Sequence, residues 1–441
     1  MYLSGSHLQL RKTGRRSNPR RIILLLALIL GGVLVLGLKE RGDVRPVGAP
    51  TPAPTRTATS YAEEAEALFA AGRLDQAVEA YKEATTRDSR NVDYWVALAR
   101  IQIYNRQYEA SLHTAETARL VAPNNVKAKA IYAWAIYWNF GLTGCKCKTQ
   151  EEALTAAREA LALDRNYAPA HAYYSEILND AGEYTEGASQ AQQALTLDPN
   201  SLDARRAMGM ANEMVGNYAG AAERYKSALA INPNLITLYL RLGRMYQALA
   251  QKGEMSYQQA IDAFTKANAI NPADVEPYLR LSEVYYQDDQ LGVAEQYLEQ
   301  ALQRDPANPL IHGKLGLLLF RRKNYEGAEP ELNLAIYGGQ YEVSKEKGKV
   351  VVKGMPLADD SKEFYYTLGN LMAYNYDCAP DRAPAVLSQV LAKFPDDATV
   401  QGSYDESMKI CANYLAGTTT PQPTPSATPR AAPKATPKAT P

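Results

Sequence analysis

Residues 238–272, LYLRLGRMYQALAQKGEMSYQQAIDAFTKANAINP, decide the fold of this chain. Helical periodicity runs on both sides of the segment QKGEMS at 251–256, which predicts two helices joined as a hairpin. Pro272 ends the second helix, because proline has no amide hydrogen to donate and its ring clashes with the preceding turn.

The closing phrase of this stretch recurs along the chain. TLDPN ends at residue 200, AINPN at 234, AINPA at 273 and QRDPA at 307, so the intervals are 34, 39 and 34 residues. The 39-residue interval has a visible cause, since 251–256 lengthens a turn, and 141–148 lengthens the turn of the third repeat in the same way. Aligning the small residue of each second helix gives eight positions: Ala77, Ser111, Ala153, Gly187, Ala221, Ala260, Ala294 and Ala328.

With this period the chain resembles the tetratricopeptide-repeat family. The resemblance covers residues 58–341 in eight units, although Arg205 and Asn212 replace the expected bulky residue and tyrosine in the fifth. It implies an all-α fold, a right-handed α-solenoid of about eight to nine hairpins in which stacking buries a continuous core. The family pattern is matched in the sixth unit by Tyr239, Leu242, Gly243, Tyr246, Ala260, Phe264, Ala267 and Pro272.

Residues 342–415 break the rhythm and then recover it. The segment GGQYEVSKEKGKVVVKGMPL at 338–357 predicts a short β-hairpin or a loop. Helical periodicity returns after it, which predicts a degenerate ninth repeat followed by a cap helix that ends near residue 415.

The two ends of the chain have a different character. Residues 1–21 form a basic leader, and the uncharged run 22–38 predicts a transmembrane signal anchor, with a cleaved signal peptide as the alternative. The cations before the run place the N-terminus in the cytoplasm and the repeat body outside it. Residues 39–57 are a Pro-rich linker, and the Pro/Thr-rich tail 416–441 is expected to be disordered.

The repeat body is acidic even though the whole chain has a formal net charge of zero. Residues 57–415 hold 35 basic and 46 acidic residues, a net charge of −11. Nucleic acid is therefore excluded as the expected partner, because phosphate binding needs clustered Lys and Arg.

Cysteines are the residues with the clearest chemistry. Cys378 and Cys411 are a disulfide candidate that would tie the end of the solenoid, if the body lies in an oxidising compartment. Cys145 and Cys147 flank Lys146; they could bind a metal, but further ligands are not near in sequence, so free thiols or a strained disulfide are preferred.

Catalytic templates are not supported by the sequence, and we expect no enzyme activity, cofactor or metal. The acidic group Asp359, Asp360 and Glu363 would be needed for a catalytic site near the C-terminus. An acidic helix start explains these residues better, because carboxylates favour helix N-termini.

The resemblance implies a partner-binding groove on the concave face, lined by the first helix of each hairpin. Aromatic residues with scattered charge suit peptide anchors, and the densest group is Trp134, Tyr137 and Trp138. The alternative, for these three and for the other groove candidates, is packing between repeats. The remaining groove candidates are Val96, Arg100, Tyr104, Leu279, Glu283 and Tyr286.

Together these features predict a membrane-anchored scaffold that binds proteins or peptide segments outside the cytoplasm, for envelope or surface assembly. The alternative is an accessory or sensor subunit that couples the exported binding domain to cytoplasmic partners through the basic leader. The sequence does not specify the partner or the oligomeric state.

Overall fold

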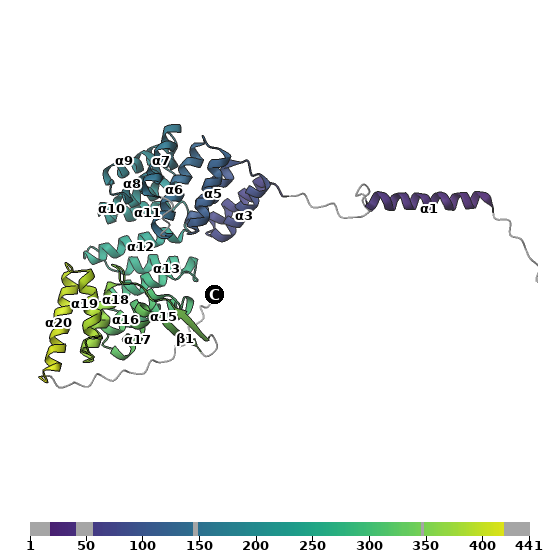
Figure 1. The fold of residues 1–441 in the computed structure, drawn as a ribbon. Helices are drawn as coiled ribbons and strands as arrows, with labels where there is room; N and C mark the ends of the chain where they lie inside the picture. The colour runs from purple at the N-terminus through teal and green to yellow at the C-terminus, as the bar shows by residue number, and fades with distance from the viewer. Residues whose placement is uncertain (1–17, 41–55, 144–148, 345–347, 419–441) are drawn as a thin grey trace, which may run out of the picture. The chain divides into compact units, whose positions relative to one another are not determined.

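The computed structural model describes residues 18–40, 56–143, 149–344 and 348–418 (Figure 1). The chain divides into two compact units, Met1–Arg56 and Thr57–Pro441. The Cys145 and Cys147 pair, the leader 1–17 and the tail from 419 onward lie outside the described residues.

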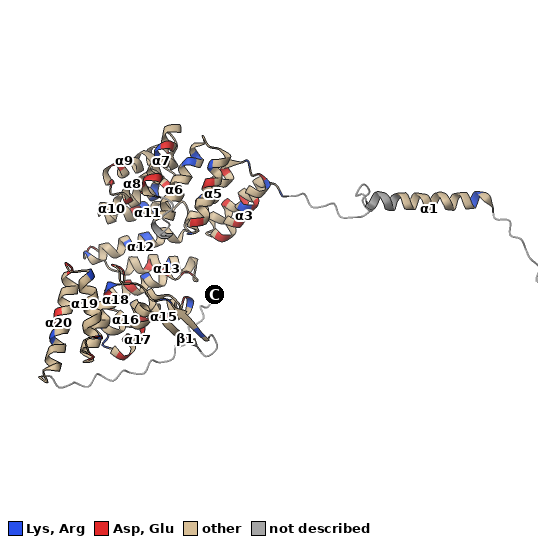
Figure 2. Ribbon diagram, viewed as in Figure 1, with Lys and Arg blue, Asp and Glu red and all other residues tan. Residues whose placement is uncertain are grey.

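The first unit contains one described helix, α1 (Pro19–Glu40). Its large apolar side chains are exposed, from 46% at Ile22 to 70% at Leu30, and the basic residues of its described part lie at its start (Figure 2). The predicted transmembrane run 22–38 falls within α1. Among the described residues, however, no helix has both the length and the apolar character needed to traverse a bilayer, so the structure does not support the predicted span.

The second unit is an all-α helical repeat solenoid, as predicted, with one short β-hairpin inserted. Its helices pair into nine hairpins in the described part of the chain, and a last helix follows them. The paired helices are α2 (Ala58–Ala70) with α3 (Leu74–Arg87), α4 (Val92–Tyr104) with α5 (Tyr108–Val121), α6 (Val126–Thr143) with α7 (Gln150–Leu163), α8 (Ala168–Asp180) with α9 (Tyr184–Leu197), α10 (Leu202–Met214) with α11 (Tyr218–Leu229), α12 (Ile236–Gln251) with α13 (Gln258–Ile270), α14 (Glu276–Gln287) with α15 (Leu291–Arg304), α16 (Pro309–Arg321) with α17 (Tyr325–Tyr337), and α18 (Lys362–Tyr374) with α19 (Ala383–Lys393), before the final α20 (Ala398–Leu415).

The recurring Asp-Pro or Asn-Pro phrase forms the turn between hairpins. Oδ1 of Asp198 accepts a hydrogen bond from the amide of Asn200 at 3.0 Å, and Asn271 accepts one from Ala273 at 3.1 Å. Such side chains stabilise a turn by bonding to the backbone two residues on, while the proline prevents the helix from continuing. The spacing of this phrase therefore sets the length of each repeat.

Close packing inside each hairpin depends on small residues. A Cβ added to Gly243 of α12 would lie 2.4 Å from the ring of Phe264 of α13, and one added to Gly209 of α10 would lie 2.6 Å from the ring of Tyr225 of α11. Phe264 and Tyr225 are fully buried. The glycine of the first helix thus makes room for the aromatic ring of the second.

The predicted break after the eighth repeat is an antiparallel β-hairpin, β1 (Gly339–Ser344) and β2 (Gly348–Val352). Gly338, directly after α17, has φ +72°, and its ideal Cβ would lie 2.5 Å from the carbonyl oxygen of Val352. Only glycine suits such a backbone position.

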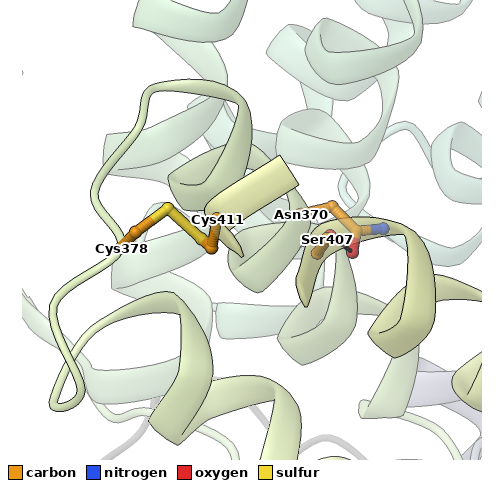
Figure 3. The surroundings of a disulfide bond; sticks show 4 residues. All are labelled: Asn370, Cys378, Ser407 and Cys411. Carbon is orange, nitrogen blue, oxygen red and sulfur yellow. Dashed lines mark hydrogen bonds between the residues drawn. A yellow bond between two sulfur atoms is a disulfide. The ribbon is translucent and has the colours of Figure 1, made fainter. Parts of the chain in front are cut away.

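A disulfide joins Cys378, after α18, to Cys411 on α20, with the two Cα atoms 5.3 Å apart (Figure 3). Both half-cystines are buried, at 4% and 1% exposure. Ser407 Oγ of α20 donates a hydrogen bond to Asn370 Oδ1 of α18 at 2.8 Å. The cap helix is therefore fixed to the ninth hairpin by a covalent bond and by a partly buried polar contact.

Candidate binding site inside the solenoid

The first hairpin contacts the turn between the fifth and sixth. The side-chain amide of Asn232, in the loop between α11 and α12, donates to the carbonyl oxygen of Phe69 at 3.1 Å. Asn234 donates to the carbonyl of Ala70 at 2.9 Å. These are among the last carbonyls of α2, which have no partner within their own helix. The solenoid thus closes on itself over its first six hairpins, so the inside of this turn is not an open groove.

First helices line the inside of this turn, since α4 contacts α6, α6 contacts α8, and α8 contacts α10. Across it, Arg100 of α4 lies opposite Asp203 of α10, with Nε 2.9 Å from Oδ2. A second long-range ion pair joins Arg106 to Asp274 at 3.2 Å. Residues more than 100 positions apart therefore meet inside the turn.

Seven side chains form what we call the inner cluster. Asp203 also accepts a hydrogen bond from the hydroxyl of Tyr104 at 2.5 Å. Glu176 accepts from Trp134 Nε1 at 2.8 Å and pairs with Arg206 Nη2 at 2.7 Å. The members of the inner cluster are Arg100, Tyr104, Trp134, Tyr173, Glu176, Asp203 and Arg206.

Aromatic rings complete the inner cluster. The ring of Trp134 stacks on the ring of Tyr173, with the two centroids 4.4 Å apart. The guanidinium of Arg206 lies 4.4 Å from the centroid of the Trp134 ring. A guanidinium at this distance from an indole ring is attracted by its quadrupole. The cluster is therefore held by stacking, cation–π contact and ion pairing together.

Burial and charge act in opposite directions on the two carboxylates. Burial raises the pKa of Asp203, but Arg100, Arg206 and the hydrogen bond from Tyr104 outweigh it, so the pKa is lowered overall. Burial raises the pKa of Glu176, and Arg206 and the bond from Trp134 only partly offset it. Two guanidinium groups face two carboxylates, so the cluster satisfies its own charges and suits a structural role.

Trp134 does not fit the predicted role of a peptide anchor. Its side chain is 0% exposed, so no partner can reach it while the solenoid keeps this winding. Tyr104 is buried as well, at 4% exposure. The burial of these two groove candidates agrees with the packing alternative, because the first helices converge on the inside of a closed turn.

Tyr137 and Trp138 are half-buried beside this cluster. The ring of Trp138 stacks on Tyr108 at 5.4 Å, and its buried Nε1 has no hydrogen-bond partner among the described atoms. Burial raises the pKa of Tyr137. Both rings thus remain partly exposed, and Tyr108 covers one face of Trp138.

The C-terminal candidates lie on α14, far from the inner cluster in sequence. Leu279 is buried at 6% exposure. Glu283 pairs with Arg280 at 3.1 Å, and the guanidinium of Arg321 covers the ring of Tyr286 at 4.3 Å. The structure does not bring these three together with the other predicted groove residues.

Val96 and Arg100, in contrast, line a pocket of about 460 Å³ at one edge of the closed turn. We call it the α2–α10 pocket, because its walls come from α2, α4, α8, α10 and the loops that precede α8, α10 and α12. It is lined by Glu66, Phe69, Ala70, Val96, Arg100, Tyr167, Pro169, Tyr173, Asp198, Ser201, Leu202, Asp203, Ile231 and Asn232.

Most of this pocket was missed by sequence reasoning. One signal was present: the fifth repeat departs from the family pattern, and its helix α10 carries Asp203 and Arg206 among small residues. Two charged side chains on the first helix of a hairpin, where the helices pack together, indicate that other parts of the chain supply their counter-charges. They do not indicate which parts.

The histidines of the repeat body that the structure buries are structural. His171 lies 2.6 Å from Gln190 Oε1, and His312 lies 2.6 Å from Glu331 Oε2. Within the described residues no group of three or more His, Cys, Asp or Glu side chains is placed to hold a metal ion. The predicted helix-start role of Glu363 agrees with its place in the first turn of α18.

Two family models described as tetratricopeptide repeat match the chain, one over residues 178–236, 247–309 and 279–342, the other over 68–135. Their segments together span just over half of the 441 residues. A search of curated proteins gives no match.

Among solved structures, a human IFIT1 dimer with PPP-AAAA is 18% identical with a TM-score of 0.53, over 82% of this chain and 83% of that one. A thermophilic repeat protein of Thermus thermophilus is 21% identical with a TM-score of 0.37, over 44% of this chain and 100% of its own. At these identities the likeness concerns the fold alone. With the family matches, the 34-residue period and the hairpins of the second unit, the chain belongs to the tetratricopeptide-repeat family.

Proposed function

We propose that this chain is a protein-interaction scaffold that binds a peptide segment of a partner at the α2–α10 pocket. The observation that carries the proposal is the pocket itself: about 460 Å³ in volume, it is built from four first helices of a tetratricopeptide-repeat solenoid. This volume lies within the range of roughly 300–1,000 Å³ that is typical of ligand sites.

The proposed role is binding without catalysis. The charged groups of the inner cluster are committed to one another, as in the Arg206–Glu176 pair at 2.7 Å, and so support shape rather than chemistry. The negative net charge of residues 57–415 supports a protein partner over nucleic acid.

A photo-crosslinking amino acid placed at Val96 tests this proposal in cells. Val96 lines the pocket, whereas Arg224 is exposed on α11, which is a second helix, and provides the matched control. We expect Val96 to capture a small, reproducible set of proteins that Arg224 does not capture. An identical set from both positions, or no capture from Val96, would contradict the proposal.

We also propose that α1 attaches the scaffold to a membrane, with the N-terminus in the cytoplasm and the repeat body outside. The exposed apolar side chains of α1, such as Leu30 at 70%, support attachment, because a large exposed apolar surface marks an interaction site. The basic residues at its start support the orientation.

Membrane extraction and protease access test this second proposal. The full chain is expected to stay in the membrane fraction at alkaline pH, and a Leu26→Lys, Leu30→Lys variant is expected to be released. External protease should digest the body of the attached protein. Release of the parent chain, or protection of its body in intact cells, would overturn attachment or orientation respectively.

A further inference from the structure

The α2–α10 pocket combines apolar walls with carboxylates near its mouth. Phe69, Val96, Leu202 and Ile231 contribute apolar surface, and Ile231 is 42% exposed even though its side chain is large and apolar. Exposure of an isoleucine side chain to water is unfavourable. A bound aliphatic chain would remove this apolar surface from water and so stabilise the complex.

The charges of the pocket are unbalanced. Asp203 is already bonded to Arg100, which is the cation of the lining. Glu66 and Asp198 are also part of the lining, are exposed, and have no ion pair with any described residue. Neither carboxylate is therefore within ion-pair distance of a cation in the described chain; Glu66 interacts with Arg100 only through the longer-range electrostatic field.

Both carboxylates are nevertheless held in place. Glu66 accepts a hydrogen bond from the hydroxyl of Tyr81 at 2.5 Å, and Asp198 accepts one from the amide of Asn200. Burial, together with the bond to Glu66, raises the pKa of Tyr81, so the hydroxyl keeps its proton and remains a donor. A fixed carboxylate binds a cation with less loss of side-chain entropy than a free one.

From this combination we infer that the α2–α10 pocket takes a lysine or arginine side chain of the partner peptide. The aliphatic stem lies along Val96, Phe69 and Ile231, and the cationic head reaches Glu66 and Asp198. Long basic side chains have this division between an apolar stem and a charged tip. The inference rests on the proposed function and specifies its ligand class.

The chain contains matched controls for both carboxylates. Glu63 is exposed on the same helix as Glu66, outside the pocket lining. Asp164 accepts a hydrogen bond from the amide of Asn166 at 2.8 Å, the same turn contact that Asp198 makes one repeat later, and is not part of the lining. The control Glu63→Gln, Asp164→Asn therefore removes the same charge from the same kinds of position.

The experiment measures fluorescence polarisation of labelled nonapeptides with the full chain. Each peptide has an Ala/Pro/Ser background and a central Lys, Arg, norleucine or Glu. We expect the Lys and Arg peptides to bind at least tenfold more tightly than the norleucine and Glu peptides. In Glu66→Gln, Asp198→Asn that preference should fall to less than twofold, while the control pair should retain it.

Two results would overturn the inference. One is a preference for Lys and Arg peptides that is equal in the pocket variant and in the parent chain. The other is an equal loss of the preference for Lys and Arg peptides in the pocket variant and in the control variant. That result would show that the preference comes only from the overall negative charge of the repeat body. In either case selective crosslinking at Val96 would still support the proposed scaffold, so the two proposals fail separately.

Discussion

The inside of the first six hairpins and the C-terminal end of the solenoid are stabilised in different ways. In the former, Arg100 and Asp203 meet across 103 positions of sequence, within a buried group of ions and rings. In the latter, the core around Phe364 and Leu368 is apolar, and Cys378 and Cys411 join neighbouring elements. The winding of the chain creates the first region, whereas local repeat packing creates the second.

This difference explains what the sequence can predict. Gly243 with Phe264, and the turn at Asn271, involve residues within one repeat, and the 34-residue pattern encodes them directly. Cys378 and Cys411 lie on adjacent elements near the chain's end, so their proximity could be anticipated. Contacts inside the closed turn depend on a small rotation at each hairpin, added over several repeats, which no local pattern specifies.

Trp134 shows most clearly which contacts the repeat pattern does not predict. The repeat pattern assigns a residue to the inner side of a first helix, but this pattern is identical in an open and in a closed solenoid. Closure turns Trp134 from a candidate anchor into a fully buried residue and leaves Val96 and Arg100 at the pocket. The sequence alone therefore predicted the fold, and of the groove candidates Val96 and Arg100 line the α2–α10 pocket.

The largest expected effect is that of Trp134→Ala. Removing a fully buried ring that also donates to Glu176 should lower the free energy of unfolding by about 3–5 kcal/mol. Trp138→Ala should cost less, because its ring is only half-buried. Urea denaturation of both variants measures the difference. A stable Trp134→Ala protein that no longer binds its partner would restore the anchor interpretation.

Loss of the disulfide affects the other region. The bond between Cys378 and Cys411 has a sequence separation of 33, and its removal by Cys378→Ser with Cys411→Ser should cost about 3–4 kcal/mol. Thermal unfolding under oxidising and reducing conditions gives the cost. Peptide mapping without reductant tests the bond itself, which is absent if both thiols of the native protein can be alkylated.

Asp203→Asn should lower the free energy of unfolding by about 2–3 kcal/mol at neutral pH, because two guanidinium groups lose a charged acceptor. The lowered pKa of Asp203 means that its stabilisation is present above the unfolded-state pKa and is lost as pH falls through the lower folded value. The difference in the free energy of unfolding between the parent chain and the variant should therefore become smaller in acid. Urea titrations from about pH 7 to pH 3 test this, and a gap that widens in acid would contradict it.

The smallest effect concerns the contact that closes the turn. Asn232→Ala removes a local turn bond and the long-range bond to Phe69, whereas Asn271→Ala removes only the equivalent local bond. Asn232→Ala should therefore lower the free energy of unfolding by about 1–2 kcal/mol more than Asn271→Ala does. Equal costs in chemical denaturation would show that the first hairpin is not fixed to the loop before α12.

The most direct test of the closed turn is a double-mutant cycle between Arg100 and Asp203. These residues are 103 positions apart, so they can couple strongly only if the first hairpins wind back onto the fifth. From the unfolding free energies of the parent chain, Arg100→Gln, Asp203→Asn and the double variant, we expect a coupling of about 1–3 kcal/mol. Additive effects, with a coupling below about 0.3 kcal/mol, would contradict the closed winding and with it the α2–α10 pocket.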